Sequence, residues 1–370
     1  MQSSERWLQR RRDRRVGWLH AFRGAAGSVL PALLILVPTN AAGQDALRGP
    51  PSQDGPVEVV VGLYLIDFVD INTDEKTFEF EAILTMRWED RRLAFDPAEV
   101  GADEKIYQGN YQFAEIYDGW WPPLMLRNES GRYEREGVVL RISPQGSVTY
   151  VEELQAVAEA DMDLRRIPFD RQRFEIVFEV LGYGIDRVRL NPDSSRTGLD
   201  ETTLTQWRLE GVEVSTAARD PAYLGEEGQL LSTIAFAYPV TRSPRYLLRL
   251  VFFPIMILIA LSWAVFWMDR ESLGDRMDIS FIGILTVVAF QIVVSDQLPR
   301  ISYFTIMSSF MYISYLTLAA SVVVNLRVGA LDKRGDVARG DRLDRTCRWL
   351  FPVGYVATLG LMVAYYLLRY

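Results

Sequence analysis

Four long apolar blocks in the last third of the chain constrain its fold more than any other feature. These blocks cover residues 246–268, 276–294, 303–326 and 347–368. Each is long enough to cross a hydrocarbon core of about 30 Å as a helix. Before about Thr241, apolar and polar residues instead alternate in short runs, which is typical of half-buried strands. The sequence therefore predicts a β domain, 44–244, followed by a transmembrane domain of four helices, 245–370.

The N-terminus indicates a secretory signal peptide over residues 1–43. A cluster of arginines precedes an apolar run from about Ala25 to Val37, and small residues follow that run. The arginines are Arg10, Arg11, Arg12, Arg14 and Arg15, and the small residues are Ala41, Ala42 and Gly43. The alternative is a first membrane helix, but the run is shorter than the roughly 20 residues that a span needs, and Pro31 interrupts it. We therefore expect an exported β domain.

Without this segment the chain is strongly acidic. Its removal takes away seven of the 40 basic residues and two of the 48 acidic ones, which changes the formal net charge from −8 to −13. Nucleic acid is therefore not an expected partner. The segment also contains His20, the only histidine, so no imidazole remains for general base catalysis or metal binding. With no Gly-rich phosphate loop either, the sequence argues against an enzyme, a cofactor and a metal site.

The β domain contains several predicted strands, rich in β-branched and aromatic residues and separated by turn residues. They are Val57–Ile66, Thr77–Trp88, Gly137–Ile142, Ser147–Glu152, Phe174–Val180, Arg187–Leu190, Trp207–Ser215 and Leu230–Tyr238. Many short strands with polar turns predict an antiparallel, immunoglobulin-like β-sandwich. Between the last two apolar blocks Lys and Arg are abundant, so the positive-inside rule places that link in the cytoplasm and both chain ends outside.

The second apolar block differs from its neighbours because acids stand at both ends. Steps of four and three residues from Asp278 define one stripe of a helix. With the flanking Asp275, the stripe comprises Asp278, Ile282, Leu285, Ala289, Ile292 and Asp296. Around an axis, several copies would form carboxylate rings that attract cations and apolar rings that close by dewetting. Acids also interact favourably with the N-terminal end of a helix dipole, so the stripe alone does not decide between a pore and a simple helix start.

Motifs along the chain resemble those of one family. The motifs are W-x-D-x-R-L at Trp88, Asp90, Arg92 and Leu93; W-x-P at Trp120 and Pro122; a signature loop with Asp163, Ile167, Pro168, Phe169, Asp170 and Gln172; the junction Arg242, Pro244 and Tyr246; and the pore-helix start Gly274–Met277. From Pro56 to Tyr370 the chain resembles the pentameric ligand-gated ion channels of the Cys-loop receptor superfamily, and within it the bacterial amine-gated cation channel. Ala160 and Phe174 replace the two cysteines that name the superfamily, as is usual in prokaryotic members.

The resemblance implies a homopentamer, surrounded by lipid of a bacterial inner membrane, with the sandwich in the periplasm. The second span would line a central pore for monovalent cations. A small-molecule agonist, such as a primary amine, would bind between subunits, where aromatic faces attract an ammonium group. The implied contacts are Tyr64, Glu179, Leu181, Tyr183, Tyr223 and Leu231, with Glu179 as the ligand carboxylate. Leucines at 181 and 231 and Met125 replace two expected aromatics and an acid, so a larger or more apolar ligand is equally admissible.

The resemblance also implies three segments that couple the sandwich to the helices. They are the turn that begins with Asn72 and Thr73, the loop of Pro168, Phe169 and Asp170, and the link containing Leu298, Pro299 and Arg300. Asp170 and Arg242 are expected to form a partly desolvated ion pair at the same level. Proton gating stays open, and without histidine it would use carboxylates such as Glu179 or Asp161. The alternative outside the channel class is a membrane-anchored sensor that conducts nothing.

Overall fold

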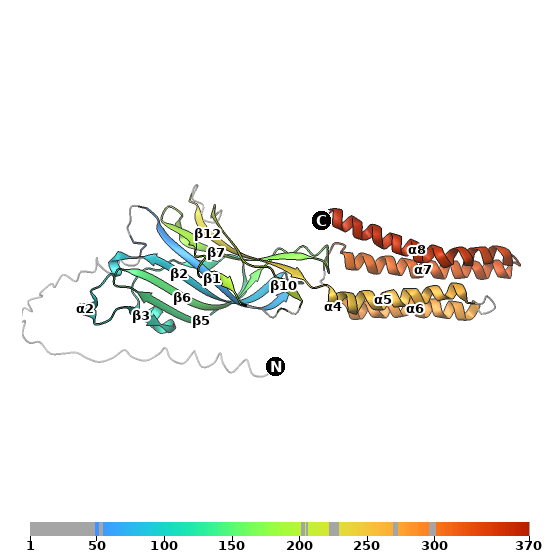
Figure 1. Ribbon diagram of the computed structural model, residues 1–370, viewed down its shortest axis with the longest axis horizontal. Helices are drawn as coiled ribbons and strands as arrows, with labels where there is room; N and C mark the ends of the chain where they lie inside the picture. Colours follow the sequence, from blue (N-terminus) through green and yellow to red (C-terminus); the bar gives the residue numbers. More distant parts are fainter. Residues whose placement is uncertain are drawn as a thin grey trace, which may run out of the picture. The chain divides into compact units, whose positions relative to one another are not determined.

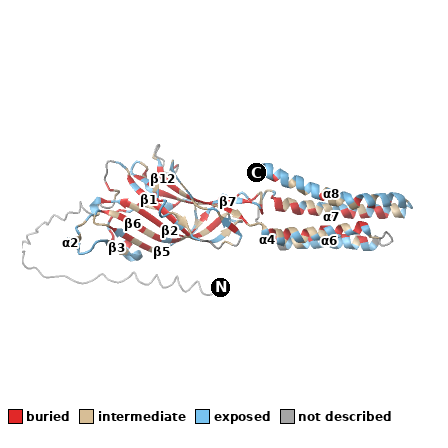
Figure 2. Ribbon diagram, viewed as in Figure 1, coloured by how far each residue is buried: buried red, intermediate tan, exposed pale blue. Residues whose placement is uncertain are grey.

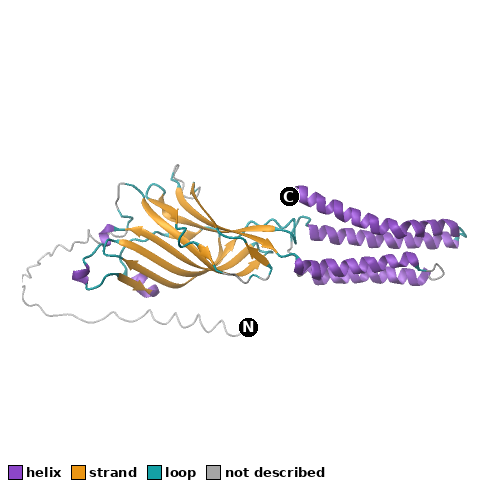
Figure 3. Ribbon diagram, viewed as in Figure 1, coloured by secondary structure: helices purple, strands orange, loops and turns teal. Residues whose placement is uncertain are grey.

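The computed structural model describes residues 49–51, 55–200, 204, 206–221, 229–268, 273–295 and 301–369, with only the backbone of Leu273 and Val293. The expected signal segment therefore lies outside the described residues. So do four of the expected site residues that follow the second apolar block, Asp296, Leu298, Pro299 and Arg300, and the expected ligand contact Tyr223. Strands occupy the chain up to Arg242, and long helices follow from Arg245 (Figures 1 and 3).

Two sheets form a sandwich. The first has seven strands in the order β3-β5-β6-β2-β1-β8, with β9 also paired to β1, and the second has the order β10-β12-β7-β4, with β11 paired to β12. The first-sheet strands are β1 (Val57–Asn72), β2 (Thr77–Glu89), β3 (Lys105–Gln108), β5 (Glu129–Ile142), β6 (Ser147–Glu159), β8 (Val188–Pro192) and β9 (Gly198–Leu199). The second-sheet strands are β4 (Leu124–Leu126), β7 (Arg171–Gly184), β10 (Trp207–Leu209), β11 (Glu213–Arg219) and β12 (Leu231–Arg242).

The strands form because apolar side chains alternate with polar ones and bury one face of each sheet. In β6 every second residue from Val148 to Ala158 is buried. An aromatic cluster fills the space between the sheets: Phe68 contacts Phe174 and Tyr238 edge to face, with ring centroids 5.6 and 5.8 Å apart. Figure 2 shows the buried residues concentrated on these strands. The predicted sandwich is confirmed.

Two details of the sandwich differ from expectation. β1 pairs with β8 and β9 in parallel, because the chain leaves β7 of the second sheet and enters the first sheet in the direction of β1. The single strand expected over Trp207–Ser215 is instead two strands that both pair with β12. Between them, Gly211 adopts a φ of 144°, a region that side chains strongly disfavour, and this interrupts the ladder.

Four long helical segments follow the sandwich. The first, Arg245–Trp267, combines α4 (Arg245–Leu247), the π-helical η4 (Leu248–Phe252), α5 (Phe253–Trp263) and the 3-10 segment η5 (Ala264–Trp267). The π-helical turn stands just before Pro254, whose nitrogen cannot donate a hydrogen bond to the preceding turn. The others are α6 (Leu273–Ser295), α7 (Ile306–Lys333) and α8 (Val337–Arg369). Short helices α2 (Pro97–Val100), α3 (Gly109–Tyr111), η2 (Arg91–Leu93) and η3 (Gln112–Ile116) lie earlier in the chain.

Three of the long segments have the length and composition to cross a membrane: Arg245–Trp267, Ile306–Lys333 and Val337–Arg369. That α6 also crosses stays a prediction. α7 and α8 are longer than expected, because most of the basic link between them is helical and only Arg334–Asp336 connects them. Arginine and lysine are good helix formers, so the end of an apolar block does not mark the end of a helix.

Candidate functional site

The predicted pore stripe lies on the face of α6 that other helices leave uncovered. Asp275, Asp278 and Ala289 are exposed in the single subunit. The three large apolar residues of the stripe are among the most exposed of the helix, Ile282 at 62%, Leu285 at 70% and Ile292 at 69%. A water-soluble surface rarely presents such residues in a row. This face therefore requires a second subunit, lipid or a pore beside it.

The opposite face of α6 is fully packed against the other helices. Its buried residues are Arg276, Ser280, Val287 and Val294, each at most 2% exposed. At about 100° per residue, these four positions lie within about 40° of one another around the helix, and the stripe from Asp278 to Ile292 lies about 160° to 240° away. The helix is thus divided into one face that packs within the subunit and one that points away from it.

A polar cluster on the packed face was not anticipated. The guanidinium of Arg276 donates to both carboxylate oxygens of Asp344 on α8, at 2.9 and 3.1 Å. Asn325 of α7 donates to the hydroxyl of Ser280 at 2.9 Å. One sequence signal points to this cluster, namely charged and polar residues within or beside apolar blocks. Asp344 lies in the segment expected to be a cytoplasmic link, and no local pattern pairs it with Arg276.

In the sandwich, the residue expected to bind an amine is already occupied. Glu179 on β7 is fully buried, and Arg219 at the end of β11 donates to its carboxylate at 2.8 Å. The side chain of Arg219 is 31% exposed, so it stands between Glu179 and the surface. The role of Glu179 as the ligand carboxylate stays a prediction, and an amine there would compete with Arg219, because a buried charge keeps the partner that compensates it.

The other expected ligand contacts divide into two groups. Tyr64 and Leu181 are exposed at 38% and 45%, and Tyr183 is partly buried. Leu231 has no exposed surface in the described subunit, and its assignment as a ligand contact stays a prediction. Met125, the expected replacement of an acid, pairs with Glu179 across the β4–β7 ladder and is 36% exposed.

Tyr183 instead belongs to an aromatic cavity of about 420 Å³. The lining residues are Ala114, Tyr117, Asp118, Gly119, Trp120, Trp121, Pro123 and Tyr183. The rings of Trp120 and Tyr183 meet edge to face at 6.1 Å. Burial, with the nearby Asp90 carboxylate, raises the pKa of Tyr117 above its usual range, so its hydroxyl stays neutral and donates to the Trp120 carbonyl at 2.9 Å. Asp118 supplies an exposed carboxylate at the same cavity.

The expected coupling residues form a compact network. Arg242 binds Asp170 with two hydrogen bonds, at 2.7 and 3.2 Å, and both side chains are buried. The guanidinium also stacks 4.0 Å from the ring centroid of Trp207, and Gln172 donates to Asp170 at 2.8 Å. The predicted ion pair is therefore confirmed, whereas its role in coupling stays a prediction. In the loop beside it Pro168 is buried and Phe169 is 49% exposed.

This loop contacts the start of α7. The amide of Ile306 donates to the Arg165 carbonyl at 3.0 Å, and the Tyr303 hydroxyl accepts from the Leu164 amide at 3.3 Å. The turn after β1 is closed by the side chain of Asn72, which accepts from the amides of Asp74 and Glu75, with Thr73 between them partly buried.

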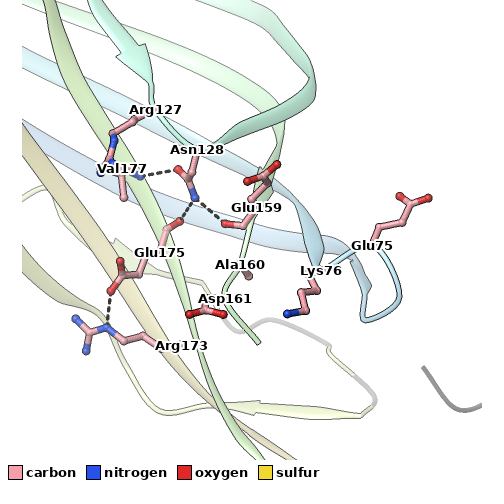
Figure 4. A pocket seen from close by; sticks show the side chains of 10 residues that line it. All are labelled: Glu75, Lys76, Arg127, Asn128, Glu159, Ala160, Asp161, Arg173, Glu175 and Val177. Atoms are coloured by element: carbon pink, nitrogen blue, oxygen red, sulfur yellow. Dashed lines mark hydrogen bonds and ion pairs between the residues drawn. The ribbon is translucent and has the colours of Figure 1, made fainter. Parts of the chain in front are cut away.

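A second, larger cavity of about 850 Å³ lies next to that turn. Figure 4 shows Asn128 at its wall, donating to the carbonyls of Glu159 and Glu175 at 2.8 and 2.7 Å. Lys76, Arg127 and Arg173 line it together with Glu75, Glu159, Asp161 and Glu175. Since charges of both signs are interspersed, this cavity does not favour one class of ion. Asp161, an expected candidate for proton sensing, is therefore next to cations as well as to acids.

Comparison with known proteins accounts for this arrangement. The family model for the neurotransmitter-gated ion-channel ligand binding domain matches residues 43–235, and the model for the neurotransmitter-gated ion-channel transmembrane region matches residues 251–340. The chain belongs to this family. Its members are pentameric ligand-gated ion channels and not enzymes, which confirms the predicted family and the prediction that the chain is not an enzyme.

Individual relatives are moderately similar. The proton-gated ion channel of Gloeobacter violaceus is 28% identical over 316 residues, which cover 85% of both chains. Acetylcholine receptor subunit beta of Xenopus laevis is 25% identical over 67% of this chain, and a gamma-aminobutyric acid receptor subunit beta of Lymnaea stagnalis is 22% identical over 76%. The matches span about half of those two subunits, 51% and 57%. The bacterial relative is named for proton gating, so the expected likeness to an amine-gated channel stays a prediction.

Proposed function

We propose that the chain forms a homopentameric, cation-selective, ligand-gated channel of a bacterial inner membrane, with the sandwich in the periplasm and α6 around the pore. The division of α6 into two faces carries this proposal. One face packs within the subunit through Arg276 and Val287, and the other presents Ile282, Leu285 and Ile292 without a partner in the described part of the subunit.

The chemistry of the free face supports cation conduction. Asp275 and Asp278 stand exposed at one end of it, so five copies around an axis would form two rings of carboxylates that concentrate cations. The apolar side chains of Leu285 and its neighbours would form rings that expel water when the pore narrows. Selectivity and closure would thus be located on one helix.

The aromatic cavity beside Tyr183 supports a small organic cation as the agonist. Trp121 and Tyr183 offer ring faces to an ammonium group, with the buried Trp120 packed against Tyr183, and the carboxylate of Asp118 offers a counter-charge. Because Glu179 is paired with Arg219, a primary amine would bind at this cavity rather than at Glu179. Tyr64 and Leu181, both exposed, would complete the site at the boundary between subunits.

Proton gating is a second candidate, favoured by the name of the relative from Gloeobacter violaceus. In that case acidification alone would open the channel, and no organic ligand would be required. Exposed acids such as Asp161 would then titrate, because the exported chain contains no histidine.

The test is voltage-clamp recording from oocytes that express the chain, with surface protein and pentamer size checked biochemically. Primary amines and acidic pH steps are applied separately to wild type, Tyr183→Ala and Tyr183→Phe. The amine proposal predicts current with amines that is lost in Tyr183→Ala and largely kept in Tyr183→Phe, which retains the ring. Current with pH steps alone assigns the channel to proton gating. Surface pentamers that conduct under neither stimulus, or conduct anions, would overturn the proposed function.

A further inference from the structure

Arg276 is the residue whose placement the proposed function does not explain. It lies directly after Asp275 and two positions before Asp278, yet it has no exposed surface while both acids are exposed. At about 100° per residue, its side chain starts about 100° from that of Asp275 and about 160° from that of Asp278 around the helix. The cation thus faces away from the two acids that are its neighbours in sequence.

The partner that holds Arg276 on this side is Asp344 of α8. The two side chains form a bidentate pair, with N–O distances of 2.9 and 3.1 Å, and Asp344 is 5% exposed. A bidentate guanidinium–carboxylate pair fixes orientation as well as distance. One turn further along α6, Ser280 accepts from Asn325 of α7, and both are at most 2% exposed. Polar contacts therefore fix the rotation of α6 against two other helices.

Among the described residues, Asp344 is the one acid that pairs with Arg276. Within the described part of the chain, the Nε of Arg276 is buried without a hydrogen-bond partner, so no second acceptor there compensates the guanidinium from that side. Loss of the Asp344 charge would leave a buried, uncompensated cation, an arrangement that is strongly unfavourable. Arginine has a long flexible stem, and the exposed carboxylates of Asp275 and Asp278 are the acids nearest to it in sequence.

We propose that Asp344 is a positioning residue for ion selectivity: it holds the guanidinium of Arg276 inside the helix bundle and so keeps the carboxylate ring of Asp275 and Asp278 un-neutralised. The inference rests on the proposed function, because it requires these acids to face the pore. Asp344 itself lies on a different helix and does not line the pore. When Asp344 loses its charge, one guanidinium per subunit turns towards the ring and cancels one of its two carboxylates.

The test is the reversal potential of evoked current in a NaCl gradient, which does not depend on how many channels reach the surface. Asp344→Asn is expected to lower the permeability ratio of Na⁺ to Cl⁻ by about tenfold, since half of the ring charge is lost. The matched control is Arg276→Gln with Asp344→Asn, in which no freed cation exists, so the ratio returns to near its wild-type value. Asp344→Glu keeps the charge and is expected to keep the ratio.

The outcomes separate the inference from the proposed function. A wild-type channel that does not conduct, or conducts Cl⁻, overturns the proposed function. A cation-selective wild type with an unchanged ratio in Asp344→Asn overturns only the inference, as does an equal fall in the single and double variants. If pure Asp344→Asn pentamers fail to reach the surface, co-expression with wild type provides mixed pentamers. Their ratio is expected to fall in proportion to the variant share, and an unchanged ratio contradicts the inference.

Discussion

Two buried arginine–carboxylate pairs, one in the sandwich and one among the helices, have the same chemistry and different surroundings. Arg242 and Asp170 are joined by Gln172 and by the ring of Trp207, so both charges have further partners. Arg276 and Asp344 are similarly buried, but among the residues that the structure describes, Nε of Arg276 has no hydrogen-bond partner and Oδ1 of the nearby Asn325 has none either. The first pair belongs to a network in which the charged groups have several hydrogen-bond or ring partners. The second pair lies beside buried polar atoms that make no hydrogen bond within the described residues, and it is therefore the better candidate for a contact that rearranges.

The largest effect is expected from breaking the satisfied pair. Arg242→Ala leaves the Asp170 carboxylate buried without its cation and uncovers Trp207, which should destabilise the protein by about 3–5 kcal/mol. We expect channels that assemble poorly or do not open, measured as surface pentamer and evoked current. Arg242→Lys is the control that retains charge. Normal surface expression together with normal current in Arg242→Ala would remove the distinction between the two pairs.

A loss of similar size is expected when one partner of the helical pair is removed, and removal of both charges should largely reverse it. Arg276→Met alone should cost about 3–5 kcal/mol, while Arg276→Met with Asp344→Leu should return to within about 1 kcal/mol of wild type, because apolar residues of similar volume often replace a buried ion pair without loss. The same replacement at Arg242 and Asp170 should not recover fully, since the buried Gln172 amide would lose one of its two acceptors. Thermal unfolding of the purified pentamers measures the stability of the single and double variants at both ion pairs. Equal recovery of stability at the two pairs would show that the residues around a pair do not decide whether it can be replaced.

An intermediate effect is expected at the half-exposed pair of Arg219 and Glu179. Arg219→Gln leaves the buried carboxylate with a weaker donor and should cost about 1–3 kcal/mol. It should also make Glu179 available to an amine and so lower the amine concentration needed for half-maximal current. Arg173→Gln, at an exposed pair on β7, is the control. An unchanged or raised amine requirement in Arg219→Gln would mean that this pair plays no part in ligand choice.

The smallest effect is expected at Asp193, whose partner Arg87 is 42% exposed. Burial alone would raise the pKa of Asp193, but hydrogen bonds from Ser195 and the charge of Arg87 outweigh burial and hold this pKa below its usual value. A lowered pKa stabilises the folded state above the unfolded value of about 3.9, and this stabilisation disappears as the pH falls through the folded value. Asp193→Asn should therefore lose about 0.5 kcal/mol at pH 7 and less at acidic pH. A pH-independent difference in melting temperature between variant and wild type would contradict this.

The same contrast explains what the sequence could predict. The alternation of apolar and polar residues predicted where the strands lie. The Asp170–Arg242 pair was predicted from two family motifs, the signature loop that contains Asp170 and the junction that contains Arg242. Arg276 and Asp344 are 68 positions apart, on segments read as a pore-helix start and a cytoplasmic link, and no local pattern joins them. Glu179 was placed correctly on its strand, but only the tertiary structure shows that Arg219 at the end of β11 covers it. Side-chain pairing between distant elements is set by packing rather than by periodicity.

The most direct test of the account is chemical accessibility of the two faces of α6. In a Cys347→Ala background, Leu285→Cys lies on the exposed face and Val287→Cys on the packed one. With the channel opened by the amine or the pH step that activates it, a cationic methanethiosulfonate is applied to both. A pore lined by the exposed face of α6 predicts irreversible block of current in Leu285→Cys and none in Val287→Cys. Equal reaction at both positions, or block only in Val287→Cys, would contradict a pore lined by this face of α6.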